Sequence, residues 1–466
     1  MKITVLNGSP KGDLSVTMQY VNLIEKKYPQ HNLKKINIAS AIKKIEKNEE
    51  AFNEIIDEIK TSDGIIWAFP LYYLAVHSGY KRFIELINLR GAESAFKNKY
   101  ATALTTSIHF FDHTAHNYIH AISDDLDMQY IGGFSPGMHD LLKSKEREKL
   151  LIFAENFFSA IKNELKTPKR FQKIKKSSFK YEAGKATNKI DSNNKRVVVI
   201  SDGGKDDKNL NAMVDRFRSS FKTPPELVNL NDIDIKGGCL GCCRCGYDNT
   251  CVYEGKDGYI DFYKDKVVGA DILVFAGAIV DRYLSSQWKR FFDRSFFMGH
   301  APTMKDKQVG FIVSGPLSQV PNITEIFNGF MECESANIID FITDECENSR
   351  DIDSHLDSLA ERLVSFSKAD YVSPATFLGV GGKKIFRDDV WGRLRFPFIA
   401  DHKYYKKHGY YDFPQKKDRS SRITNKVLIM LTKIPQMRKE IYVNKMKDEM
   451  VKPFMKVVEK ADGPAS

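Results

Sequence analysis

Short apolar runs rich in β-branched residues alternate with amphipathic stretches along most of the chain. In the first third, the expected strands are residues 3–6, 33–38, 64–68, 100–106 and 128–131, and the expected helices are residues 17–28, 49–60, 77–87, 113–125 and 143–165. Helices between successive strands indicate parallel pairing through right-handed crossovers. The pattern therefore predicts a doubly wound α/β sheet, in which ligands bind at the carboxyl ends of the strands.

The alternation begins again after a polar, weakly periodic segment at 167–195, which we interpret as a linker. Lys81-Arg-Phe-Ile-Glu and Lys289-Arg-Phe-Phe-Asp occupy the same place in the two series, so we interpret the chain as a degenerate tandem duplication. The expected domains are residues 1–166 and 196–370, each a doubly wound parallel sheet, followed by a basic, mostly helical extension at 371–466.

Length and charge add to this picture. The 466 residues exceed one ordinary core, and no apolar run approaches the roughly 20 residues that cross a bilayer. No secretory signal precedes the first strand, so we expect a cytoplasmic protein. The net charge is +11, and residues 371–466 hold all of it, with 21 Lys and Arg against 10 Asp and Glu. We expect this extension to pack as a helical arm rather than to bind nucleic acid or an anionic membrane surface.

Five of the seven cysteines lie in residues 239–251, which we call the cysteine loop. Cys239, Cys242, Cys245 and Cys251 follow C-x2-C-x2-C-x5-C spacing, which lets thiolates from one loop converge on a compact metal centre. A [4Fe-4S] cluster is the preferred interpretation, because zinc sites more often join two separated C-x2-C pairs. Zinc is one alternative, and unmetallated thiols or a redox disulfide are the other.

The turn between the first strand and the first helix carries small and hydroxyl residues at 7–17, and we call it the hydroxyl turn. A glycine-bearing turn into a helix N-terminus directs free N–H groups at one point, which suits a phosphate. Ser9, Ser15 and Thr17 add hydroxyls and Lys11 adds a charge; a plain helix cap is the alternative. The equivalent residues 201–209, the acid turn, hold three aspartates that would repel a phosphate. We therefore expect one nucleotide site, in the first domain.

Two further loops follow strands of the first domain. Pro70, Leu71 and Tyr72 belong to an aromatic loop at 67–73 that can present amides and ring faces to a planar heterocycle. Four histidines at 109–120 follow the fourth strand, and solvated histidines explain them better than a metal site does. Because this loop also lies at the carboxyl edge, His109 and His113 are the candidate proton donors or substrate contacts.

The hydroxyl turn, Pro70-Leu-Tyr72, the Lys81-Arg-Phe-Ile84 helix and the cysteine loop together resemble the flavodoxin-like NAD(P)H-dependent FMN reductases, in particular the iron–sulfur flavoprotein branch. The resemblance implies two flavodoxin-like domains, with FMN bound in the first, and a homo-oligomer. It implies these cofactor-binding residues: Ser9, Pro10, Lys11, Ser15, Val16, Thr17, Pro70, Leu71, Tyr72, Tyr73, Thr106 and Ser107. In the family the cysteines and FMN share a domain, whereas here the cysteines of the second domain would approach the flavin of the first if the two domains pack like a homodimer of that family.

These inferences predict an FMN-dependent NAD(P)H oxidoreductase that transfers electrons from a nicotinamide, through flavin and any cysteine-bound cluster, to an unidentified acceptor. A non-catalytic flavodoxin-like electron carrier is the second interpretation. A basic scaffold that binds nucleic acid or membrane is the third. NAD(P)H turnover separates the first two, and binding that weakens steeply with salt would favour the third.

Overall fold

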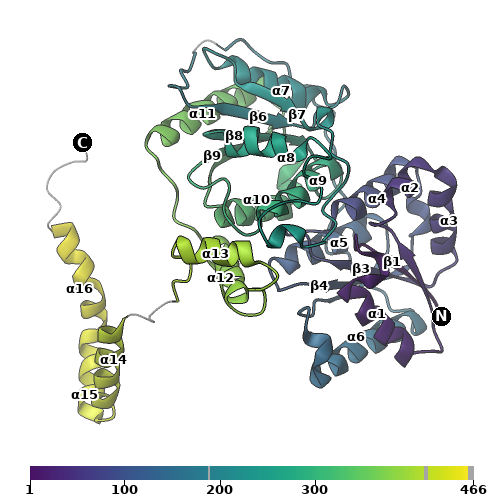
Figure 1. Ribbon diagram of the computed structural model, residues 1–466, viewed down its shortest axis with the longest axis horizontal. Coiled ribbons are helices and arrows are strands. Elements are labelled where there is room, and N and C mark those ends of the chain that lie inside the picture. The colour runs from purple at the N-terminus through teal and green to yellow at the C-terminus, as the bar shows by residue number, and fades with distance from the viewer. Residues whose placement is uncertain (187–188, 414–417, 460–466) are drawn as a thin grey trace. The chain divides into compact units, whose positions relative to one another are not determined.

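The computed structural model describes residues 1–186, 189–413 and 418–459. Residues 187–188 of the expected linker, and residues 414–417 and 460–466 of the expected extension, lie outside the described residues. Residues 1–405 form one compact unit, and residues 406–466 form a second. Within the first unit, we call residues 1–166 the first half and residues 196–370 the second half (Figure 1).

The first half contains a five-stranded parallel sheet with the order β2-β1-β3-β4-β5. Its strands are β1 (Lys2–Asn7), β2 (Asn32–Asn37), β3 (Gly64–Pro70), β4 (Tyr100–Thr106) and β5 (Gln129–Phe134), and its helices are α1 (Val16–Lys27), α2 (Ile42–Lys47), α3 (Glu49–Lys60), α4 (Ser78–Leu89), α5 (Asp112–Asp125) and α6 (Ser144–Lys162). Because β1, β3 and β4 are neighbours, the loops that follow them meet at the carboxyl edge of the sheet.

The second half contains another five-stranded parallel sheet, ordered β10-β9-β8-β6-β7. Its strands are β6 (Val197–Ser201), β7 (Glu226–Asn229), β8 (Ile272–Ala278), β9 (Gln308–Ser314) and β10 (Asn337–Thr343), and its helices are α7 (Lys208–Ser219), α8 (Tyr259–Phe262), α9 (Ser286–Ser295), α10 (Pro321–Cys333) and α11 (Ser349–Lys368). Read in the opposite direction, from β7 to β10, this order is the same as that of the first sheet, with β6 in the place of β1. The predicted α/β fold with two doubly wound parallel sheets is confirmed.

The C-terminal extension is mostly helical, as predicted. It consists of α12 (Phe377–Trp391), α13 (Ile399–Lys407), α14 (Arg419–Leu431), α15 (Pro435–Lys439) and α16 (Met446–Glu459), with a π-helical turn at Glu440–Lys445 before α16. Throughout the described part of the chain, each helix is too short or too polar to span a bilayer.

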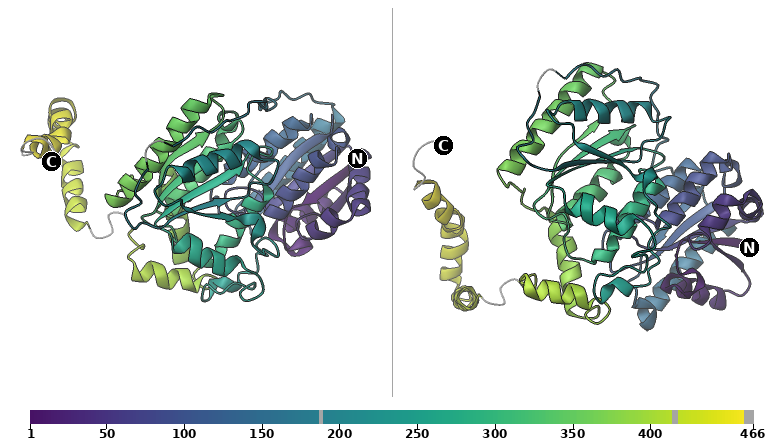
Figure 2. Two further views of the ribbon diagram at one scale, coloured as in Figure 1. Left: turned by 90° about the horizontal axis from the view of Figure 1, so that it is seen from above. Right: turned by 45° about the horizontal axis from the view of Figure 1, so that its top comes forward.

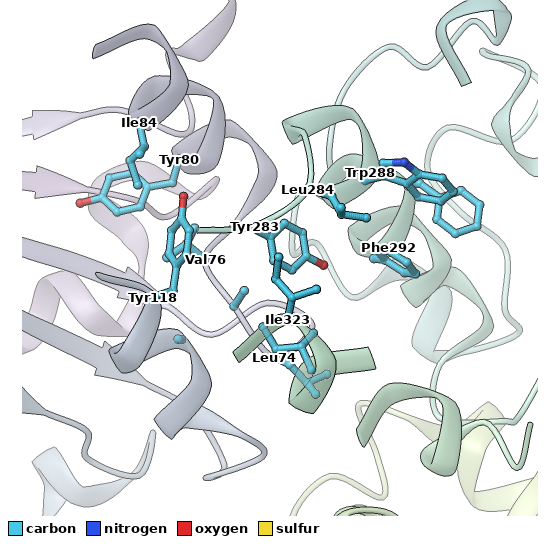
Figure 3. Packing of buried hydrophobic residues seen from close by; sticks show 14 of the residues in the cluster. Leu74, Val76, Tyr80, Ile84, Tyr118, Tyr283, Leu284, Trp288, Phe292 and Ile323 are labelled. Carbon is cyan, nitrogen blue, oxygen red and sulfur yellow. The ribbon is translucent and has the colours of Figure 1, made fainter. Parts of the chain in front are cut away.

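One cluster of the apolar core extends through both halves of the first unit. Leu74, Tyr80 and Tyr118 of the first half lie in the same buried cluster as Tyr283 and Ile323 of the second half (Figure 3). The two halves lie side by side in both turned views (Figure 2). Burial of aromatic and aliphatic side chains between two elements is the main stabilising contribution to their association. The contact between the halves is therefore part of the core of the protein.

Helices α4 and α9 meet at this contact, and a carboxylate on each helix caps the start of the other. The backbone N–H of Ser78 donates to Asp293 Oδ2 (2.7 Å), and the backbone N–H of Ser286 donates to Glu85 Oε1 (2.6 Å). Each carboxylate also pairs with the lysine one turn earlier on its own helix. A negative charge at a helix N-terminus is favourable, so each helix stabilises the start of the other. Such reciprocal contacts are typical of a two-fold interface.

Candidate functional site

The hydroxyl turn after β1 is held by its own side chains. Asn7 Oδ1 accepts the N–H of Ser9 (3.0 Å), and Ser9 Oγ accepts the N–H of Lys11 (3.2 Å). A β-carbon on Gly8 would lie 2.8 Å from side-chain atoms of β3 and α4, so glycine is required for this close approach. The turn is therefore fixed against β3 before it reaches the first helix.

Ser15 caps α1, because its Oγ accepts the N–H of Met18 (3.2 Å). The N–H groups of Val16 and Thr17 begin the helix and have no acceptor within it, so they are available to an anion. The hydroxyls of Thr17 and Thr106 are buried and bond each other (2.6 Å), which ties α1 to β4. The turn thus combines a braced backbone with free donors at a helix start.

The aromatic loop after β3 is attached to the end of β4, because the N–H of Leu71 donates to the Thr106 carbonyl (3.2 Å). Tyr72 and Ala75 exchange backbone hydrogen bonds of 3.0 and 3.1 Å. Tyr73 lies between them with a φ of 37°, in the left-handed region that side-chain-bearing residues rarely adopt. Trp67 and Phe69 are fully buried and belong to the core.

The structure brings the predicted cofactor-binding residues to one edge of the first sheet. The four buried residues are Ser9, Ser15, Thr17 and Thr106. The six half-buried residues are Pro10, Pro70, Leu71, Tyr72, Tyr73 and Ser107. The two exposed residues are Lys11 and Val16. The hydroxyl turn, the aromatic loop and the end of β4 are joined by the hydrogen bonds given above. They form one candidate site.

The cysteine loop of the second half packs on this site. Gly241 has a φ of 62°, and a β-carbon there would overlap the Tyr72 hydroxyl and lie 3.0 Å from the Lys11 side chain. Burial, together with the nearby Cys239 thiol, raises the pKa of Tyr72 well above its usual value, so this tyrosine stays protonated. The cysteine loop therefore reaches the first-half site across the contact between the halves.

His77 fixes this contact and is the residue that sequence reasoning missed. Its Nε2 donates to the Cys239 carbonyl (2.9 Å), while its Nδ1 accepts the N–H of Gly79 (3.0 Å). The two bonds require the neutral Nε2–H tautomer, and burial lowers the pKa of His77 accordingly. In the sequence, the feature that could have identified His77 is its position directly before Ser78, at the start of an expected helix.

The thiols of the cysteine loop differ in their burial. Cys245 is buried, Cys239 and Cys251 are half-buried, and Cys242 is exposed. Burial raises the pKa of Cys245 to about 12 and also raises that of Cys239, so both are protonated thiols at neutral pH. Within the described ranges, no three His, Cys, Asp or Glu side chains are grouped so that they could hold a metal ion. The predicted ligand set does not fit a metal centre in this arrangement.

The histidines after β4 serve separate contacts. His109 is exposed, and its Nδ1 bonds Asp112 Oδ2 (2.9 Å). The Nε2 of His113 bonds Glu325 of α10 (2.7 Å). Burial lowers the pKa of His116 to about 4, so it is neutral at physiological pH. Of the two candidate proton donors, His109 is the one whose outer nitrogen has no hydrogen-bond partner among the described residues.

The extension up to residue 405 returns to the same region. The ring of Phe386 on α12 lies 4.3 Å from that of Phe110 and 3.9 Å from that of His300. His300 Nδ1 bonds Asp401 Oδ2 of α13 (2.6 Å). A β-carbon on Gly246 would collide with the backbone just before α13. Helices α12 and α13 therefore enclose the loop after β4 and the cysteine loop.

The acid turn of the second half is held by a serine hydroxyl, since Ser201 Oγ accepts the N–H of Gly203 (3.1 Å), and by carboxylates. Asp207 Oδ2 accepts the N–H of Gly204 (2.7 Å), and Asp202 accepts the hydroxyl of Ser285. Burial raises the pKa of Asp202 to about 6, so it is mostly ionised at neutral pH. The turn therefore presents negative charge at the position where the hydroxyl turn presents free donors.

Comparisons with known proteins concern the first half. Residues 1–139 match the family model described as NADPH-dependent FMN reductase, which is less than half of the chain. A search of curated proteins found no match.

Among solved structures, an apo NADH:FMN oxidoreductase is 16% identical, covers 34% of this chain and 89% of its own, and has a TM-score of 0.30. A flavoenzyme NAD(P)H:(acceptor) oxidoreductase from Paracoccus denitrificans is 15% identical, covers 35% and 97%, and has a TM-score of 0.29. An FMN-dependent NADH-azoreductase from Bacillus anthracis in complex with FMN is 14% identical, covers 35% and 98%, and has a TM-score of 0.25. At such TM-scores these likenesses carry no argument about this chain.

Proposed function

We propose that this chain is an FMN-dependent NAD(P)H oxidoreductase that holds one flavin on its first half and transfers electrons to an acceptor. The observation that carries the proposal is the convergence of the hydroxyl turn, the start of α1 and the aromatic loop at one sheet edge. The description of the family model that matches residues 1–139 supports it.

The residues present fit FMN. Ser9, Lys11 and the free N–H groups at the start of α1 would hold the phosphate, because a helix N-terminus and a nearby cation both favour an anion. Pro70, Leu71 and Tyr72 would contact the ring. When bound, FMN supplies hydride acceptance from a nicotinamide and release of one or two electrons. The protein binds and orients it.

The cysteine loop closes the Tyr72 side of this site. Its backbone is fixed by the His77 bond to the Cys239 carbonyl, so the loop excludes water on that side and limits where an acceptor can approach. Homodimer-like packing of the two halves would produce this contact. The loop thus acts on the first-half site even though it belongs to the second half.

His109 is the proposed proton donor. Hydrogen bonds and the neighbouring His109 lower the pKa of Asp112 below its usual value despite partial burial, so Asp112 is a carboxylate that orients the His109 ring. The Nε2 atom of His109 is then free to hold a proton near the site edge. His113 is tied to Glu325 through its Nε2, which leaves it the weaker candidate.

A [4Fe-4S] cluster or zinc on Cys239, Cys242, Cys245 and Cys251 is a separate part of the proposal. It requires these thiols to regroup, and we derive no electron-transfer step through it. Anaerobic purification with iron and zinc counts tests it. Iron or zinc that is bound stoichiometrically and lost in a C239A/C242A variant would support a metal centre, and metal-free protein would exclude one.

The test of the main proposal is purification of the full chain with FMN, followed by absorption spectra and NADH and NADPH oxidation assays. We expect yellow protein with one FMN per chain and turnover of at least one nicotinamide. Bound flavin without nicotinamide oxidation would favour an electron carrier. Protein that stays colourless after incubation with FMN would overturn the proposal.

A further inference from the structure

A cavity of about 500 Å³ lies at the contact between the halves, beside the acid turn. Asp202 and Asp207 of the acid turn and Arg290 of α9 line it from the second half, and Glu46 and Arg82 line it from the first half. Its volume falls within the roughly 300–1,000 Å³ of small-molecule sites. No role in the proposed flavin chemistry uses this cavity.

The corresponding place in the first half is filled by peptide backbone. There, at the start of α4, His77 bonds the Cys239 carbonyl, and a β-carbon on Gly238 would overlap the Ser78 hydroxyl. Residues Ser285 and Ser286 occupy the equivalent positions at the start of α9, and both line the cavity. The second half therefore keeps the groove, but no described segment of the chain fills it.

The charges of the cavity are not all compensated. Arg82 is paired with Glu46 and Glu85. Arg290, its equivalent on α9, makes no hydrogen bond or ion pair with any residue that the structure describes, although it is half-buried. Asp202 accepts the Ser285 hydroxyl and Asp207 accepts the Gly204 N–H, and neither carboxylate forms an ion pair with a residue that the structure describes. A ligand that satisfies the cavity must therefore carry both an anionic and a cationic group.

We propose that this cavity binds a short zwitterionic peptide of two or three residues, with its carboxylate on Arg290 and its ammonium group on Asp202 and Asp207. The backbone of such a peptide corresponds to the segment of the cysteine loop that fills the groove of the first half. Ser286 and Gln287 line the same cavity; the Ser286 hydroxyl donates to Glu85 and Gln287 Nε2 donates to the Leu230 carbonyl, so their side-chain oxygens are the atoms that could accept the peptide N–H groups. This inference goes beyond the proposed flavin chemistry and does not depend on it.

The test is isothermal titration calorimetry of the full chain with triglycine, N-acetyl-triglycine and triglycine amide. We expect saturable binding of triglycine and at least tenfold weaker binding of both blocked peptides, because each lacks one charged end. R290Q and D207N should each weaken triglycine binding at least tenfold. R350Q, which removes an exposed arginine of α11 outside the cavity, is the matched control and should leave the affinity unchanged.

Absence of saturable triglycine binding, or binding that R290Q and D207N leave unchanged, would overturn the proposal. Equal binding of the blocked peptides would also overturn it, because the two charged ends would then play no part. Circular dichroism of each variant checks that it is folded. Flavin content measured on the same samples keeps this result separate from the outcome for the proposed oxidoreductase.

Discussion

The hydroxyl turn and the acid turn follow equivalent strands of two sheets with the same topology, yet they satisfy their backbones differently. In the first, the hydroxyl of Ser9 accepts a backbone N–H, and the start of α1 stays free for an anion. In the second, the carboxylate of Asp207 accepts the equivalent kind of N–H. The comparison shows that one sheet topology accommodates both a turn held by hydroxyl and amide side chains and a turn that carries carboxylates.

The grooves at the starts of α4 and α9 also differ between the two halves. Backbone of the cysteine loop fills the groove of the first half, and the groove of the second half is an open cavity. Each half thus keeps one of two features: a turn suited to a phosphate with a filled groove, or a self-satisfied turn with an open groove. Mutations in each half test this contrast.

The largest effect is expected from the reciprocal caps that hold the halves together. Asp293→Ala leaves the buried Lys289 and the N–H of Ser78 without a partner, so it should lower the free energy of unfolding by about 3–5 kcal/mol. Glu85→Ala should cost a similar amount. Urea unfolding followed by circular dichroism measures both. Asp57→Ala, in an exposed pair with Lys60, is the control and should cost less than about 1 kcal/mol.

A negative charge in the hydroxyl turn should make it repel a phosphate, as expected of the acid turn. Ser15→Asp places a carboxylate at the start of α1, where it would repel the FMN phosphate, so FMN affinity should fall about 100-fold, or ~2.7 kcal/mol. Quenching of FMN fluorescence on titration measures the affinity. Asn22→Asp adds the same charge two turns along α1 and should change affinity less than about threefold. Equal losses in the two variants would contradict a local phosphate site.

The acid turn should carry a pH-dependent penalty that the hydroxyl turn lacks. The pKa of Asp202 is about 6 in the folded chain, above its unfolded value of 3.8, so its carboxylate destabilises the folded state as pH rises through 6. Asp202→Asn should therefore raise the free energy of unfolding by about 2 kcal/mol at pH 7.5. The gain should vanish below about pH 4, where both states are protonated. Urea titrations at the two pH values test this; a gain independent of pH would refute it.

The smallest effect concerns the contact between the cysteine loop and Tyr72. Gly241→Ala should cost about 1–2 kcal/mol, because its β-carbon overlaps the Tyr72 hydroxyl at a positive φ. Tyr72→Phe removes that hydroxyl, so the same glycine substitution should cost less in the Tyr72→Phe background. A double-mutant cycle of thermal unfolding measures the difference. Full additivity would mean that the cysteine loop does not rest on Tyr72.

The fold followed from the sequence because buried parallel strands read as continuous apolar runs, such as the run in β3 that is buried from Gly64 to Phe69. Helix α2 was not predicted, because it has six residues and buries only Ile45. This segment is too short to show a helical periodicity of apolar positions. The contrast marks the limit of local patterns.

The sheet edge also allowed the hydroxyl turn and the aromatic loop to be grouped, since loops after neighbouring parallel strands must meet. The bond from His77 to Cys239 could not be foreseen, because 162 positions separate the two residues and the contact depends on how the halves pack. The missing partner of Arg290 is likewise a property of the packed halves. Spacing along the chain also predicted convergent cysteine thiols, whereas among the described residues no three possible ligands are grouped to hold a metal ion.

The reciprocal caps on α4 and α9 join two parts of one polypeptide. In a symmetric dimer every substitution appears twice, so neither copy can change alone. Here Lys81 pairs with Asp281, while the position equivalent to Asp281 in the first half is Tyr73. Because one polypeptide carries both sides, the interface survives dilution and each side is free to specialise independently of the other.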